Sequence, residues 1–228
     1  MIKGIKTRKI IVLCINILLI AMEIAGLILM TELYKSYNLH PLGWLKYYTQ
    51  LSNIFSMFAA LVVVIYTAKD LINNTDTTPK WVRIFKFSSA CCLTETFLVT
   101  IFVLAPMGMM GGLLPLMFEG PNLFHHTLCP LVSVLSLCLW EKGSKITFRH
   151  CVYSMIPTLI YGVVSVTLNL LRVWHGPYPF LYVYEQPVYM SLIWAVVVLG
   201  GAFAITLMVK VLANIKKQKE NNYGEKEQ

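Results

Sequence analysis

The chain has 228 residues, of which 57% are hydrophobic and only 13% are charged. Because soluble globular domains carry about 25% charged residues, this composition excludes an ordinary soluble domain and predicts an integral membrane protein. The net charge of +8 does not indicate nucleic-acid binding, since the basic residues are distributed among alternate segments between the apolar runs.

Six apolar runs approach or reach the roughly 20 residues that cross a bilayer as a helix. They cover residues 10–30, 48–68, 84–105, 123–140, 152–171 and 188–212. The connections are short, so we predict one domain, residues 1–213, that forms an all-α polytopic membrane bundle of six transmembrane helices. Residues 214–228 are charged and lack a core pattern, which predicts a disordered tail.

The distribution of basic residues predicts the orientation of this bundle. The two terminal segments and the second and fourth connections hold 16 Lys and Arg residues, whereas the other connections hold 3. By the positive-inside rule, both termini are predicted to be cytoplasmic in a multi-pass protein of the cell membrane. The six cysteines lie within or beside apolar runs without metal-ligand spacing, so we predict no metal site and no cofactor.

The second predicted helix begins with a polar stripe. Thr49, Ser52, Asn53 and Ser56 follow the i, i+3, i+4, i+7 spacing that places four side chains on one helix face. An unpartnered hydroxyl or amide is costly in hydrocarbon. This face is therefore predicted to line the bundle interior or a hydrated cavity.

Two further polar stripes follow in the fourth and fifth predicted helices. The first comprises Asn122, His126, Cys129, Ser133 and Ser136, with His125 at its edge, and the second comprises Ser154, Thr158, Tyr161, Ser165, Asn169 and Arg172. The first and third helices each carry one buried acid, Glu23 and Glu95. An ionisable residue at that depth indicates either a functional group or a neutral, hydrogen-bonded structural carboxyl.

With the termini inside, polar groups of three helices meet at the outer membrane level. There a side-chain hydroxyl and an imidazole would form the kind of pair that nucleophilic catalysis uses. Asn53, Asn122 or backbone amides would stabilise an oxyanion, and Arg172 would hold an anionic head group. The candidate site residues at this level include Thr49, His126 and His125, and the candidate substrate-binding residues are Ser52, Asn53, Asn122, Asn169, Arg172, Glu23 and Glu95.

Two outer connections would cover this level. Residues 105–121 are rich in Gly, Pro and Met and carry no Lys or Arg, which is typical of an adaptable apolar lid or of a flexible loop. Residues 174–187 form an aromatic turn made rigid by proline.

Three short motifs are Lys46-Tyr-Tyr-Thr49, His126-Thr-Leu-Cys-Pro130 and Pro177-Tyr-Pro-Phe-Leu181. Together they resemble the androgen-induced protein family and, more closely, its bacterial six-helix relatives. The animal members hydrolyse fatty acid esters of hydroxy fatty acids with a threonine and a histidine. The resemblance therefore implies Thr49 as the nucleophile and a histidine as the base. The bacterial spacing favours His126, the animal spacing favours His125, and Ser52 is an alternative hydroxyl.

Three functional hypotheses follow. The first is a threonine-dependent hydrolase that takes a lipid-like ester from the membrane lipid. The second is a small transporter or a lipid- or ion-binding protein, with Glu23, Glu95 and Arg172 along its path. The third is a structural subunit without a cavity. A hydrolase clusters its polar groups at one depth, whereas a carrier continues them to the cytoplasmic side. The sequence predicts no oligomeric state.

Overall fold

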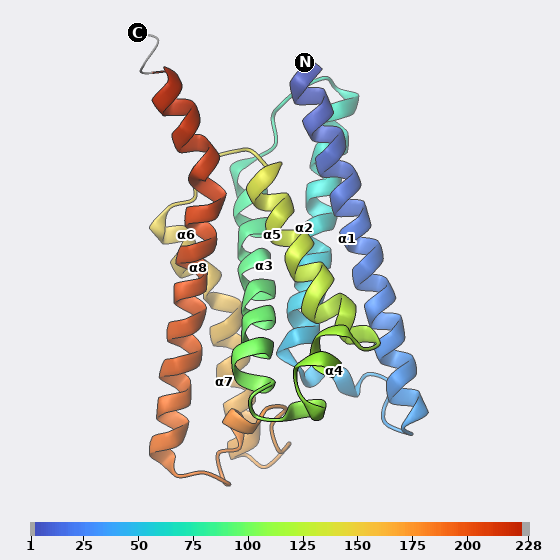
Figure 1. Ribbon diagram of the computed structural model, residues 1–228, viewed down its shortest axis with the longest axis vertical. Coiled ribbons are helices and arrows are strands. Elements are labelled where there is room, and N and C mark those ends of the chain that lie inside the picture. The colour runs from blue at the N-terminus through green and yellow to red at the C-terminus, as the bar shows by residue number, and fades with distance from the viewer. Residues whose placement is uncertain (1–2, 225–228) are drawn as a thin grey trace.

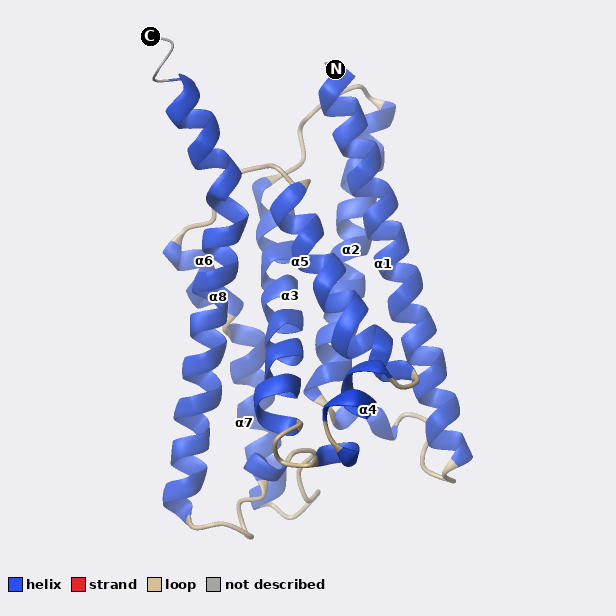
Figure 2. Ribbon diagram, viewed as in Figure 1, coloured by secondary structure: helices blue, strands red, loops and turns tan. Residues whose placement is uncertain are grey.

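The computed structural model describes residues 3–224, with side chains described for residues 4–215. The helices are α1 (Lys3–Ser36), α2 (Tyr48–Ile72), α3 (Lys80–Val99), α4 (Leu113–Phe118), α5 (Cys129–Leu139), α6 (Phe148–Ser154), α7 (Ile156–Leu170) and α8 (Val188–Gly224). A π-helical segment, η2 (Thr100–Leu104), continues α3, and another, η4 (Leu123–Leu128), leads into α5. Short 3-10 turns lie at η1 (Gly43–Lys46), η3 (Met109–Gly111) and η5 (Pro179–Leu181). The described chain is helical apart from its connections (Figure 2), which confirms the predicted all-α class.

Five helices in the described part of the chain are long and apolar enough to cross a membrane. They are Gly4–Ser36, Tyr48–Ile72, Lys80–Leu104, Phe148–Leu170 and Val188–Ile215. The predicted span 123–140 corresponds to a shorter apolar helix, Leu123–Leu139. The multi-pass membrane character is therefore supported by helix length and hydropathy, whereas a sixth crossing stays a prediction.

Four helices form a closed ring. α1 packs against α2, α2 against α3, α3 against α5, and α5 against α1 (Figure 1). The start of α1 and the end of α8 lie at the same end of the bundle, which we call the terminal end; the other is the distal end. That both termini lie on the cytoplasmic side of the membrane stays a prediction.

α8 and α7 lie outside this ring and pack differently. α8 contacts α3 and α5, where Phe87, Leu137 and Val209 are buried in one apolar cluster. α7 has only sparse contacts with α6, α8 and η5. The chain bends between α6 and α7 at Met155, just before Pro157, because proline cannot donate the backbone hydrogen bond of a continuous helix. The loose packing of α7 leaves room for cavities on both of its sides.

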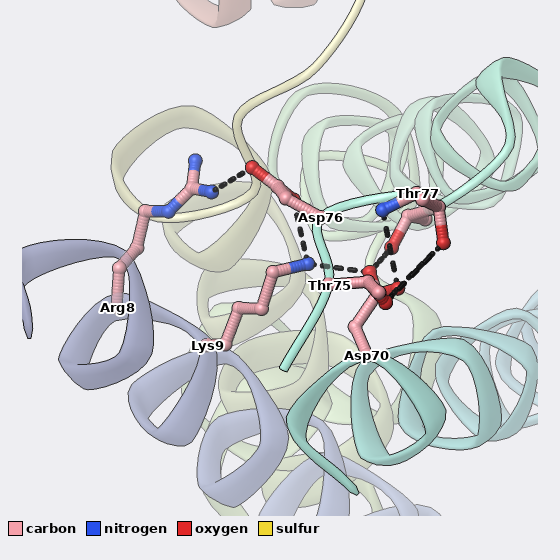
Figure 3. Close-up of polar contacts among 7 residues, drawn as sticks. Arg8, Lys9, Asp70, Thr75, Asp76 and Thr77 are labelled. Carbon is pink, nitrogen blue, oxygen red and sulfur yellow. Dashed lines mark hydrogen bonds and ion pairs between the residues drawn. The ribbon is translucent and has the colours of Figure 1, made fainter. Parts of the chain in front are cut away.

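A cluster of charges joins the terminal ends of α1 and α2 to the connection that follows α2 (Figure 3). Lys9 Nζ lies 2.5 Å from Asp70 Oδ2 and 2.7 Å from Asp76 Oδ1, and Arg8 pairs with Asp76 at 3.5 Å. Three threonines of the connection donate hydrogen bonds to Asp70: Thr75, Thr77 and Thr78. The buried Asp70 carboxylate therefore orders this turn.

The helix α8 extends into the segment 214–228, for which the composition predicts disorder. Asn214, placed in the disordered tail by its composition, donates to the carbonyl of Ile146 and accepts from the same residue's N–H, at 2.9 and 3.1 Å. The helix then continues to Gly224, because the charged residues of this segment are good helix formers. Residues 225–228 of the predicted tail lie outside the described residues.

Candidate functional site

The candidate site is a cavity of about 450 Å³ between α3, η2, α7 and α8. Aliphatic and aromatic side chains form most of its wall: Val99, Leu104, Leu159, Val163, Val166, Phe180, Leu181, Leu192, Trp194, Ala195, Val198 and Leu199. Two groups of polar residues also line it, one around Thr49 and one around Glu95. The cavity thus joins an apolar wall to polar groups from α2, α3 and α7.

Thr49 lies in the first turn of α2, where backbone N–H groups have no partner within the helix. Its N–H donates to the Tyr178 hydroxyl oxygen at 3.3 Å, and its Oγ1 lies 3.4 Å from the same oxygen. Because the phenol oxygen accepts from the amide, its proton is free to point toward Oγ1. Burial raises the pKa of Tyr178 to about 12, so the phenol remains a donor at neutral pH.

The connection between α7 and α8 fixes Tyr178 in place. Its ring stacks on Phe180, with centroids 5.1 Å apart, and meets Tyr47 edge to face at 5.8 Å. Pro177 and Pro179 flank it, and proline restricts the backbone on both sides. The predicted aromatic turn therefore places the Tyr178 hydroxyl next to the first turn of α2.

Glu95 is the carboxyl group that lines this cavity. Its Oε2 accepts hydrogen bonds from Tyr48 at 2.8 Å and from Thr158 at 2.7 Å. Both donors occupy helix positions whose side chains reach the same space: Tyr48 opens α2, and Thr158 lies in the first turn of α7. The two hydroxyl groups therefore hold the Glu95 carboxyl group at the wall of the cavity.

Ser52 and Asn53 bond next to Thr49 and hold the backbone around it. Ser52 Oγ donates to the Thr49 carbonyl and lies 2.9 Å from Thr96 Oγ1. Asn53 Nδ2 donates to the carbonyls of Thr49 and His125, at 2.7 and 3.2 Å. The predicted meeting of α2 with the histidine segment therefore occurs through Asn53. Ser52 also lines a second cavity, of about 480 Å³, on the opposite side of Tyr48.

The two adjacent histidines point to different neighbours. His125 Nε2 lies 3.9 Å from Glu23 Oε2 and 3.4 Å from the Glu23 carbonyl oxygen. The His125 ring also fills the space that a side chain on Gly26 of α1 would occupy. His126 Nδ1 contacts the Leu116 carbonyl of α4 at 2.5 Å. The hydrogen bonds of the two imidazoles in the described chain do not include Thr49 Oγ1.

The side chains of the polar stripe predicted for the fourth helix separate into two groups at η4, one that contacts α4 and one that lies further along α5. Asn122 donates to the Pro115 carbonyl at 3.1 Å, and Thr127 donates to that of Met117 at 2.6 Å, so both join His126 in holding α4. Ser133 and Ser136, further along, are fully buried. A π-helical turn bonds i to i+5, which breaks the 3.6-residue repeat on which the predicted stripe depended.

The distal end of α7 does not join the Thr49 group. Asn169 donates to the His175 carbonyl and so fixes the start of the aromatic turn. Arg172 is exposed, has a left-handed backbone (φ 55) and lies with its guanidinium 4.5 Å from the centre of the Tyr184 ring. Glu23, Glu95 and Arg172, which a carrier would align on one path, therefore lie in three different surroundings.

Sequence reasoning missed three important residues. Tyr178 was assigned to a surface turn, Tyr48 was passed over, and Lys86 was counted among the cytoplasmic basic residues although it is fully buried in α3. A signal for Lys86 was present: it precedes Ser89 and Glu95 within a helix of membrane length, where a charge indicates function.

Among the described side chains, no group of three or more His, Cys, Asp and Glu residues has a geometry that would hold a metal ion. Comparisons of this chain with protein-family models, with curated proteins and with solved structures gave no match.

Proposed function

We propose that the protein binds an acyl chain of a membrane lipid in the cavity between α3, η2, α7 and α8. The observation that carries the proposal is the pairing of an extended apolar wall with the polar groups of Thr49, Tyr178 and Glu95 in one space. Its volume of about 450 Å³ lies within the range of about 300–1,000 Å³ typical of small-molecule sites.

The position of the cavity favours a ligand that comes from the bilayer. Val163 of α7 and Leu192 of α8 line it and are also exposed. In an integral membrane protein such side chains face lipid, so a chain can enter laterally between the two helices. The loose packing of α7 makes that entrance possible without disturbing the closed ring of α1, α2, α3 and α5.

We further propose that the ligand is a fatty acyl ester and that Thr49 is its nucleophile, as the resemblance to the androgen-induced protein family implies. The Thr49 oxygen would form a bond to the ester carbonyl carbon, and the alcohol oxygen would leave with a proton. Water would then cleave the acyl–threonine ester, which releases the fatty acid and restores the hydroxyl. Tyr178 supports this proposal, since its phenol is within 3.4 Å of Thr49 Oγ1.

In this proposal the base is His125, His126 or Glu95. His125 is connected to Thr49 through Asn53, and Glu95 lines the same cavity as Thr49. A histidine base would require its ring to leave Glu23 or Leu116, whereas a Glu95 base would require only release of one donor. Separate variants of the three residues distinguish these routes.

Two alanines of α8 offer a matched test of lipid binding. Ala195 lines the cavity, whereas Ala204 is exposed on the same helix and does not line it. Native mass spectrometry of protein extracted from membranes should detect bound lipid in the wild type and in Ala204→Phe, and at least tenfold less in Ala195→Phe. Equal lipid in the two variants would overturn the binding proposal.

Hydrolysis is tested separately with a lipid-tailed fluorophosphonate. We expect labelling of the wild type, none of Thr49→Ala, and retained labelling of Ser52→Ala. Loss of labelling in His125→Ala, His126→Ala or Glu95→Gln identifies the base. If lipid is bound but the wild type takes no label, the protein is a non-catalytic lipid-binding protein, and the hydrolase proposal fails alone.

A further inference from the structure

A second set of buried polar side chains lies inside the closed ring of α1, α2, α3 and α5, away from the acyl cavity. We call it the polar column; it comprises Asn16, Glu23, Ser56, Lys86, His125 and Ser133. Each has at least one buried polar atom without a hydrogen-bond partner among the described residues. For Glu23 these are both carboxylate oxygens, and for Lys86 the ammonium nitrogen. Both side chains are fully buried.

Such a concentration of unpaired groups indicates enclosed water. Buried polar groups in proteins are almost always hydrogen-bonded, either to protein or to ordered water. A buried water makes about three hydrogen bonds and bridges groups that protein atoms leave unsatisfied. Here the candidate partners come from all four sides: α1 supplies Glu23, α2 Ser56, α3 Lys86 and α5 Ser133.

The ionisable groups of this region follow one another along the bundle axis. Toward the terminal end, Glu141 accepts hydrogen bonds from Asn16 at 3.1 Å and from Ser136 at 2.7 Å. Lys86 lies within electrostatic range of both Glu141 and Glu23. Glu23 Oε2 is in turn 3.9 Å from His125 Nε2. The order from the terminal end is therefore Glu141, Lys86, Glu23 and His125.

The distal end of this series reaches the acyl cavity. Asn53 donates to the carbonyls of both His125 and Thr49, and Thr49 lines the cavity. Other titratable groups facing the series are Arg83 and Cys138 near Glu141, Cys129 near Glu23, and His126 beside His125. The charges of these neighbours influence how readily the groups of the series gain and lose protons.

We propose that the polar column is hydrated and carries protons between the terminal end of the bundle and the acyl cavity. A proton taken up by the Glu141 carboxylate passes through water to Lys86 or Glu23 and then to His125 Nε2. The opposite ring nitrogen, Nδ1, which has no hydrogen-bond partner among the described residues, releases a proton to water that leads to the acyl cavity. Each group is reprotonated by the one before it, so no group changes its charge over a complete transfer. The proposal does not depend on hydrolysis at Thr49.

The test measures proton flux into vesicles that contain the purified protein and a pH-sensitive dye. With a potassium gradient and valinomycin, wild-type vesicles should acidify at least tenfold faster than protein-free vesicles. Glu23→Gln should reduce the rate to the protein-free level. The matched control, Glu185→Gln, removes an exposed carboxylate that pairs with His175 outside the ring and should keep the wild-type rate.

Two additional measurements keep the test decisive. A Glu23→Gln/Lys86→Gln variant removes both buried charges together, so it avoids leaving one unpaired, and it should also abolish flux while remaining monodisperse. Replacing sodium with choline should leave wild-type flux unchanged. A wild-type rate equal to that of protein-free vesicles, an unchanged rate in Glu23→Gln, or a requirement for sodium would each overturn the proposal.

Discussion

Buried polar groups differ in their hydrogen bonding between the closed ring and the α7 side of the molecule. Inside the ring the helices pack on every side, yet Glu23 and Lys86 make no side-chain hydrogen bond of normal geometry with the described residues, although Ser56 and Cys129 lie near the Glu23 carboxyl group. Beside loosely packed α7, the carboxyl group of Glu95 has two donors, and the space around it is lined mainly by apolar side chains. The occupants that we propose differ accordingly: water and protons within the ring, and an acyl chain beside α7.

The comparison teaches that burial alone does not identify the role of a membrane carboxyl group. Glu23 and Glu95 look alike in the sequence, since each is the lone acid of an apolar run, residues 10–30 and 84–105 respectively. Their neighbours separate them: Glu23 faces Lys86 and His125 inside the ring, whereas Glu95 faces two hydroxyl groups and a cavity.

The largest expected effect concerns the charge cluster that joins α1 to α2 (Figure 3). Removing one partner of a buried ion pair costs about 3 kcal/mol, so Asp70→Asn should lower the free energy of unfolding by that amount. Asp76→Asn is the matched control, because Asp76 pairs with the same Lys9 but its side chain is 47% exposed. Its effect should be below about 1 kcal/mol. Unfolding in mixed micelles of detergent and dodecyl sulfate measures both values, and equal losses would contradict the assignment.

A pair of glycines compares the packing of the two regions directly. Alanine at Gly26 would place its Cβ against the His125 ring, whereas a Cβ at Gly162 of α7 meets nothing within 4 Å. Overpacking costs about 1–3 kcal/mol, so Gly26→Ala should destabilise the protein by about 2 kcal/mol. Gly162→Ala should be neutral or stabilise it by up to about 1 kcal/mol, because alanine favours the helix. The same micelle titration tests both, and a destabilised Gly162→Ala would show that α7 is more tightly packed.

The smallest expected effect concerns the Tyr178 hydroxyl. Tyr178→Phe removes the two long contacts of the hydroxyl with Thr49, which together contribute about 1 kcal/mol, but it should slow fluorophosphonate labelling of Thr49 severalfold. Tyr182→Phe, in the same connection, should leave labelling unchanged. A Tyr178→Phe protein that labels at the wild-type rate would remove the phenol from the proposed chemistry.

The raised pKa of Tyr178 gives this prediction a pH signature. The phenol ionises at about 10 in the unfolded chain and at about 12 in the fold. Its contribution to stability is therefore constant below pH 10 and is lost as the pH rises from about 10 to about 12. Over this pH window, the thermal unfolding temperature should fall more steeply for the wild type than for Tyr178→Phe.

Much of the fold and part of the site were predictable from the sequence. Apolar runs of membrane length predicted the long helices, and the polar stripe of α2 correctly predicted that Thr49, Ser52, Asn53 and Ser56 are buried. These features are local, because an apolar run and a helical repeat depend only on neighbouring residues. The cytoplasmic location of both termini, which the basic residues predicted, stays a prediction.

What the sequence by itself determined was which face of each helix is polar; the tertiary structure decided what each face meets. The π-helical segment η4 directs His125 toward α1 and His126 toward α4, an outcome that a regular 3.6-residue repeat does not encode. Lys86 became part of the interior only because α1, α2 and α5 surround it. The physical reason is that periodicity belongs to one helix, whereas the partners of a buried side chain depend on how several helices pack together.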